Sequence, residues 1–135
     1  DKYYLRERNI SHVYDDIFRL TDGSSFRVLI YNGDTDMMIS PHHTLFNTDK
    51  IAKANSFEAR LIFETETEPW TFFGDFAGVR NSYKNGNVTM DVLTVRGAGH
   101  SVPTDLPAQT FQMIHNFIFT EDNHAIDYST PIREH

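Results

Sequence analysis

The sequence has 135 residues, of which 39% are hydrophobic and 13% aromatic, so it holds enough apolar material for the core of one domain, or of part of a larger one. Its 19 acidic and 12 basic residues give a formal net charge of −7, and the basic residues form no run, which argues against nucleic acid as a partner. No apolar stretch is long enough to cross a membrane.

Two features of composition bear on the compartment and point in opposite directions. The chain has no cysteine, which favours a reducing compartment or a segment that takes no part in disulfides. It also has two N-glycosylation sequons, Asn9-Ile10-Ser11 and Asn87-Val88-Thr89, and these favour the secretory route.

The first half of the chain predicts two helices around a buried strand. Ser11 is expected to cap a helix that runs to about residue 20, and a polar turn follows over 21–25. Residues 26–31 (FRVLIY) form a nearly all-apolar run that is typical of a strand buried on both faces in a parallel sheet. After the polar loop NGDTD, Ser40-Pro41 predicts the start of a helix that continues to residue 54.

The second half predicts mainly strands and a final helix. Strands are expected over residues 59–63, 70–73 and 76–80, with an acidic stretch over 64–68. An Asn-Gly turn within residues 84–87 leads into a strand over 88–95, which runs straight into Gly97-Ala98-Gly99-His100. Asp105 precedes a helix over 106–119, and the tail after residue 120 is polar and expected to be irregular.

Asp36 and His100 are the residues most suited to catalysis, because each follows a predicted strand. Open α/β sheets place active sites at the carboxyl ends of their strands, and the α/β-hydrolase triad runs nucleophile, acid, histidine along the chain. The residues alone leave other interpretations open. The GDTD stretch also suits a simple turn, and a metal site with His42 and His43 is conceivable, although adjacent histidines on a helix diverge. A lone Gly-His at a strand end is commonly structural.

The two loops together resemble one family. The stretch VLIYNGDTDM (28–37) resembles the acid loop of serine carboxypeptidases, the group that contains cathepsin A and carboxypeptidase Y. The stretch LTVRGAGHSVPTDLP (93–107) resembles that family's histidine loop, and the likeness is greatest to the cathepsin A branch. The resemblance implies an α/β class: the C-terminal part of an α/β-hydrolase domain over residues 1–135, a mostly parallel sheet with flanking helices that is incomplete without an upstream portion.

The resemblance also assigns roles to residues. Asp36 is expected to be the catalytic acid and His100 the base, while Asp34 braces the loop. Met37 and Ser101 are expected to contact substrate, and no metal or cofactor is implied. Two departures stand out: the family often has a cysteine where this chain has Ile39, and a large apolar residue where it has Ser101.

The nucleophile is missing from this chain, because no G-x-S-x-G motif occurs in it. The expected function is that of a serine carboxypeptidase in which an upstream chain or segment carries the serine, peptides are the substrates, and this chain alone is inactive. The compartment is expected to be lysosomal, vacuolar or extracellular, and a homodimer stays open. The alternatives are a carboxypeptidase-like acyltransferase or lyase and a silent, protective scaffold protein.

Overall fold

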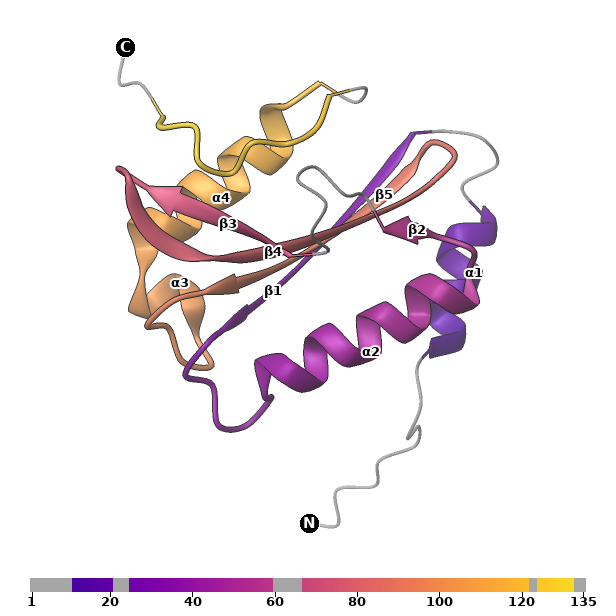
Figure 1. The fold of residues 1–135 in the computed structure, drawn as a ribbon, viewed down its shortest axis with the longest axis horizontal. Helices are drawn as coiled ribbons and strands as arrows, with labels where there is room; N and C mark the ends of the chain where they lie inside the picture. The colour runs from indigo at the N-terminus through magenta and orange to yellow at the C-terminus, as the bar shows by residue number, and fades with distance from the viewer. Residues whose placement is uncertain (1–10, 21–24, 60–66, 122–123, 133–135) are drawn as a thin grey trace.

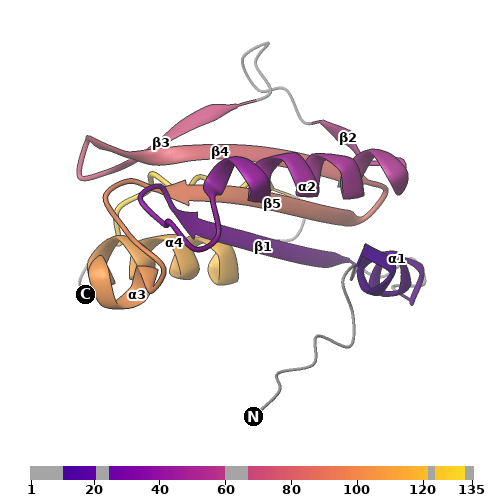
Figure 2. The same ribbon diagram turned by 90° about the horizontal axis from the view of Figure 1, so that it is seen from below.

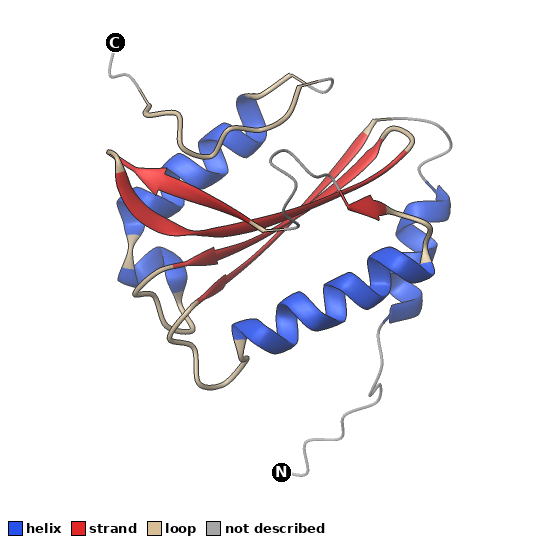
Figure 3. Ribbon diagram, in the orientation of Figure 1, coloured by secondary structure: helices blue, strands red, loops and turns tan. Residues whose placement is uncertain are grey.

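The computed structural model describes residues 11–20, 25–59, 67–121 and 124–132, and has an α/β architecture. One mixed sheet runs through the middle, with helices on both of its faces (Figures 1 to 3). The helices are α1 (Ser11–Leu20), α2 (Pro41–Ala54), α3 (Val102–Asp105) and α4 (Pro107–Phe119). The strands are β1 (Phe26–Gly33), β2 (Glu58–Ala59), β3 (Glu68–Phe72), β4 (Asp75–Asn85) and β5 (Val88–Val95).

The parallel arrangement expected from the sequence is found between β1 and β5, whose register runs from Phe26 opposite Val88 to Gly33 opposite Val95. The other pairings, of β4 with β2, β3 and β5, are antiparallel, so the described sheet is mixed. The cause of the β4–β5 pairing is a hairpin: Gly86 takes a left-handed φ of 55° and reverses the chain within two residues. Because β1 and β5 are parallel neighbours, the loops that follow them leave the sheet side by side, at the carboxyl ends of the two strands.

Two hydrophobic clusters, one on each face, hold the helices to the sheet. Alternate residues of β5 supply both, with Met90 and Val92 facing α2 and Leu93 and Val95 facing α4. β1 divides in the same way, with Leu29 on the α4 side and Val28 and Ile30 on the α2 side, which is why residues 28–30 are all apolar. The cluster on the α4 side contains Trp70, Ala77, Leu93, Val95, Ala98, Val102, Met113, Ile126 and Tyr128.

The strands predicted over residues 70–73 and 76–80 have different bounds in the structure. β3 begins at Glu68, which the sequence placed in an acidic connection, because its buried carboxylate forms an ion pair with Arg80 on the neighbouring strand. β4 continues to Asn85 through polar residues that pair with β5 and bury Tyr83. β2 (Glu58–Ala59) contains the first residue of the strand expected over 59–63; residues 60–66 lie outside the described ranges.

The tail is irregular, as predicted, but it is not a loose polar segment. Ile126 and Tyr128 are buried against the sheet. On α4, Gln112 donates to the Tyr128 carbonyl at 2.8 Å, and Asn116 donates to the carbonyls of Asp127 and Thr130 at 3.1 and 2.9 Å. The polar side chains of α4 therefore bind the tail as part of the fold.

The helices agree with the predictions in position but differ in detail. Ser40 makes no side-chain capping bond to α2, although Pro41 opens that helix as expected. The short helix α3, which was not predicted, lies between His100 and α4. No helix among the described residues is long and apolar enough to span a membrane.

Candidate active site

The loops after β1 and β5 are held together by contacts to backbone atoms at the carboxyl ends of the two strands. The N–H and the Oγ1 of Thr35 both donate to the Ala98 carbonyl, at 3.0 and 2.7 Å, and the Asp34 N–H donates to the Val95 carbonyl at 3.0 Å. Gly33 packs so closely that a Cβ there would lie 2.2 Å from the Ala98 carbonyl oxygen. The two loops thus form one rigid unit, and a side chain at position 33 would force them apart.

Asp36 and His100 meet on this unit. The Nδ1 of His100 lies 3.0 Å from Oδ2 of Asp36, although the residues are 64 apart in sequence. The Asp36 side chain is only 3% exposed, whereas that of His100 is 57% exposed. A buried carboxylate therefore holds one ring nitrogen, and the exposed ring leaves Nε2 accessible to a reacting group.

Four neutral or weakly basic donors surround the Asp36 carboxylate. Oδ1 accepts the backbone N–H groups of Met38 and Ile39 at 2.8 and 3.1 Å, and Oδ2 accepts from His100 and from Nδ2 of Asn32, the latter at 3.3 Å. Burial alone would raise the pKa of Asp36, but these hydrogen bonds outweigh it and lower the pKa from 3.8 to about 2. The carboxylate therefore remains ionised through the mildly acidic range.

Asp34 has a different position. Its Oδ1 accepts the Gly97 N–H at 2.6 Å, which ties the acid loop to the start of the histidine loop. Gly97 has a left-handed φ of 82°, which glycine adopts without strain. On the other side of the histidine, the Asp105 carboxylate accepts the Gly99 N–H at 2.8 Å. Two carboxylates thus shape the backbone that carries His100, and neither contacts its ring.

The two residues expected to contact substrate are both exposed near the pair. Met37 follows Asp36 and is 98% exposed. The Asp36 carboxylate accepts the N–H groups of Met38 and Ile39, and the resulting turn leaves the Met37 side chain on its outside. Ser101 follows His100, and its Oγ lies 2.9 Å from Oγ1 of Thr104. Exposure makes both available to a ligand, and their role in substrate binding stays a prediction.

The remaining sequence candidates lie elsewhere. Asn87 is exposed in the β4–β5 turn, whereas Asn9 lies outside the described residues. His42 and His43 are exposed at the start of α2. Within the described ranges, the structure contains no group of three or more histidine, aspartate or glutamate side chains placed to hold a metal ion.

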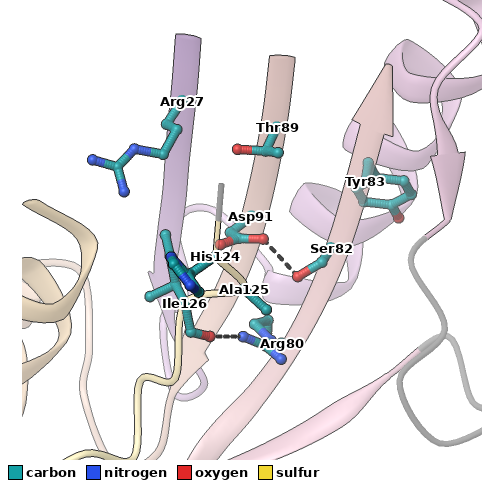
Figure 4. Close-up of a pocket in the computed structure, with 9 residues that line it drawn as sticks. All are labelled: Arg27, Arg80, Ser82, Tyr83, Thr89, Asp91, His124, Ala125 and Ile126. Atoms are coloured by element: carbon teal, nitrogen blue, oxygen red, sulfur yellow. Dashed lines mark hydrogen bonds between the residues drawn. The ribbon is translucent and has the colours of Figure 1, made fainter. Parts of the chain in front are cut away.

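Figure 4 shows a second polar cluster, lined by residues of β1, β4, β5 and the tail, which includes neither Asp36 nor His100. Asp91 accepts Ser82 Oγ at 2.5 Å and the Tyr128 hydroxyl at 2.6 Å, and Arg80 donates to the Ile126 carbonyl. Burial, reinforced by the Asp91 charge, raises the pKa of Tyr128, so its hydroxyl stays protonated as a donor. These polar groups form hydrogen bonds with one another or with the backbone of the tail. We therefore interpret the cluster as the contact that holds the tail on the sheet.

Sequence reasoning missed Asn32, which is buried beside Asp36 and contacts it directly. The sequence feature that could have identified it is a polar residue at the end of an apolar strand, directly before the Gly33-Asp34 turn. Amides at such positions commonly bond nearby backbone, so sequence alone did not separate this residue from ordinary turn formers.

Comparisons with known proteins identify the family of the chain. Residues 3–120 match the serine carboxypeptidase family. The chain is 33% identical to serine carboxypeptidase ctsa-3.1 of Caenorhabditis elegans, over 96% of this chain and 23% of that protein. It is 29% identical to serine carboxypeptidase ctsa-3.2 of the same organism, over 98% of this chain and 26% of that protein.

A plant relative shows the same relation: serine carboxypeptidase-like 37 of Arabidopsis thaliana is 41% identical, over 71% of this chain and 18% of that protein. The chain thus spans about a quarter or less of the length of these curated relatives. With the family match covering most of its residues, the chain belongs to the serine carboxypeptidase family.

Proposed function

We propose that this chain supplies the acid and the base of a serine carboxypeptidase, with Asp36 as the acid and His100 as the base. The observation that carries the proposal is the 3.0 Å contact between His100 Nδ1 and Asp36 Oδ2, on loops that follow parallel strands in the chain order of the α/β-hydrolase triad. Family membership supports the same reaction class.

In the proposed reaction, Asp36 accepts the Nδ1–H of His100 and so leaves Nε2 unprotonated and ready to act as a base. Nε2 takes the proton of a serine hydroxyl as the serine attacks the C-terminal peptide bond, and the imidazolium returns that proton to the leaving amine. Water then cleaves the acyl-serine by the same route. Asp36 stays ionised throughout, because its hydrogen bonds lower its pKa to about 2.

The serine is proposed to come from an upstream chain or segment, because this sequence has no G-x-S-x-G motif. Among the described strands β1 pairs with β5 only, so one edge of β1 is open to a further strand. Around Asp36, the side chains of Met37, Met38 and Ile39 are 98%, 80% and 53% exposed. Such an apolar surface next to a reactive pair suits contact with the rest of the domain and with peptide substrate.

A fluorophosphonate probe tests the proposal. In the full-length protein we expect one serine to be labelled, and blocked dipeptides to be hydrolysed at the C-terminal bond. The chain of residues 1–135 expressed alone is expected to remain unlabelled, because it lacks the nucleophile.

Each departure from this result selects an alternative. No labelling of the full-length protein would indicate the silent scaffold, and labelling without release of C-terminal residues would indicate an acyltransferase or lyase. Labelling of the isolated chain would contradict the proposed division of the triad.

We also propose passage through the secretory route to a lysosome, a vacuole or the cell exterior, with glycan on Asn87. This asparagine is exposed at the tip of a hairpin, where a glycosyltransferase can reach it. Mass spectrometry of the protein from a eukaryotic host should find the glycan on Asn87. Thr89→Ala should abolish it and Thr89→Ser should keep it, because only the latter preserves the sequon. An unmodified Asn87 in the secreted protein would overturn this assignment.

A further inference from the structure

Asn32 is the one side chain besides His100 that donates to the Asp36 carboxylate among the described residues. It lies at the end of β1 and is 7% exposed. Its Nδ2 donates to Asp36 Oδ2 at 3.3 Å and to the Ile39 carbonyl at 2.9 Å. One amide group therefore touches both the carboxylate and the backbone that follows it.

The orientation of this amide follows from its neighbours. Both atoms within reach of Nδ2 are acceptors, so turning the amide over would set its carbonyl oxygen against two other oxygens. Oδ1, in contrast, is buried and has no hydrogen-bond partner among the described residues. The described hydrogen bonds of this side chain are therefore both made by its donor end, to Asp36 and to the Ile39 carbonyl.

The chemistry of the site favours a neutral donor at this position. Oδ2 receives two hydrogen bonds, one from His100 and one from Asn32, and Oδ1 receives two from the backbone. Without Asn32, His100 would be the one side-chain donor left to Oδ2 among the described residues, so the position of Oδ2 would be less restrained. A lysine or arginine would brace it too, but would neutralise the charge that stabilises the imidazolium.

We infer that Asn32 is a positioning residue, which holds the Asp36 carboxylate in the plane and at the distance that His100 requires. This inference rests on the proposed function and deepens it. Because Asn32 acts through Asp36, its replacement should lower turnover and leave substrate binding unchanged.

The test measures kcat and KM on a blocked dipeptide for variants of the full-length enzyme. Turnover is expressed per mole of folded protein, measured from the melting transition, because the fluorophosphonate probe would react slowly with any variant that impairs the Asp36–His100 pair. Asn32→Ala should lower kcat by about ten- to a hundredfold with KM unchanged, the range for losing a hydrogen bond to a charged group. Asn32→Asp should be at least as severe at neutral pH, because it sets a second carboxylate beside Asp36.

Asn81→Ala is the matched control. The Oδ1 of Asn81 is also buried and has no hydrogen-bond partner among the described residues. Asn81, however, lies on β4, opposite Val92 of β5. Its replacement should leave kcat and KM at their wild-type values, whatever it does to the melting temperature. A fall in kcat for Asn81→Ala equal to that for Asn32→Ala would overturn the inference, because it would make the effect a general one.

A double-mutant cycle with Asp36→Ala separates this inference from the proposed function. Once Asp36 is gone, adding Asn32→Ala should change the residual turnover by less than about twofold, because residues that act as a unit are not additive. If Asp36→Ala itself keeps most of the activity, the proposed function is wrong. If Asp36→Ala abolishes activity while Asn32→Ala has no effect on kcat, or has an equal effect in both backgrounds, only the positioning role is wrong.

Discussion

Asp36→Asn in the full-length enzyme is expected to lower turnover by about ten-thousandfold, the loss known for this change in a serine triad. The structure provides the reason. The backbone N–H groups of Met38 and Ile39 hold Oδ1, so the new amide must place its carbonyl there and its NH2 where Oδ2 was. That NH2 faces His100 Nδ1 and forces it to become an acceptor. The proton then sits on Nε2, and the histidine cannot act as a base.

Asp34→Asn is the matched comparison, since it makes the same chemical change two residues away. Asp34 accepts one hydrogen bond, from the Gly97 N–H, and an asparagine carbonyl can accept it equally well. We expect less than a tenfold loss of turnover, in line with a single local hydrogen bond. The measurement is turnover per mole of folded protein, with a melting curve to exclude unfolding. If Asp34→Asn abolished activity while Asp36→Asn retained most of it, the roles of the two aspartates would be reversed.

The strands that carry the site could be predicted because their signal is local. The apolar run over residues 26–31 and the run over 88–95 correspond to β1 (Phe26–Gly33) and β5 (Val88–Val95). Burial between two helical layers demands apolar residues on both faces of a strand, and a short window of sequence shows this directly. Once the strands are parallel, the meeting of the loops at one edge follows from geometry.

The polar parts of the fold could not be predicted in the same way. Glu68 reads as exposed because it is charged, yet its partner Arg80 lies on another strand and both are buried. Tyr128 similarly binds Asp91, at a separation of 37 residues. A buried polar group is tolerated only when a partner satisfies it, and a window of neighbouring residues does not contain that partner. Asn32 was missed for a different reason: its partners Asp36 and Ile39 are close in sequence, but an asparagine beside a turn commonly bonds nearby backbone.

The choice between Asp34 and Asp36 marks the limit of the sequence at the site. Both are acidic and both follow β1, so the residue pattern does not separate them, and the expectation for Asp36 came from the family resemblance. The structure separates them by their hydrogen bonds: Asp34 binds the Gly97 backbone, and Asp36 binds the His100 ring. The catalytic role of Asp36 stays a prediction that the two variants test.

Gly33→Ala should have the next largest effect, because it acts on the contact that brings the two loops together. A Cβ at this position would lie 2.2 and 2.3 Å from the carbonyl oxygens of Ala98 and Gly99, and backbone atoms cannot swing away as a side chain can. The loops must separate, and with them Asp36 and His100. A displacement of about 1 Å costs on the order of a hundredfold in rate, so we expect at least that loss of kcat and a lower melting temperature.

Gly99→Ala is the control for this change, because it adds the same methyl group to the opposing loop. Its Cβ would meet only the Asp105 carboxylate oxygen, at 3.2 Å, and that side chain can move by a few tenths of an ångström. We therefore expect less than a tenfold loss of kcat per mole of folded protein. Wild-type turnover in Gly33→Ala would contradict the close packing of the loops. Equal losses of kcat in both variants would show that an added methyl group anywhere in the loops is harmful. A large loss confined to Gly33→Ala would locate the constraint in the backbone contact that sets the distance between Asp36 and His100.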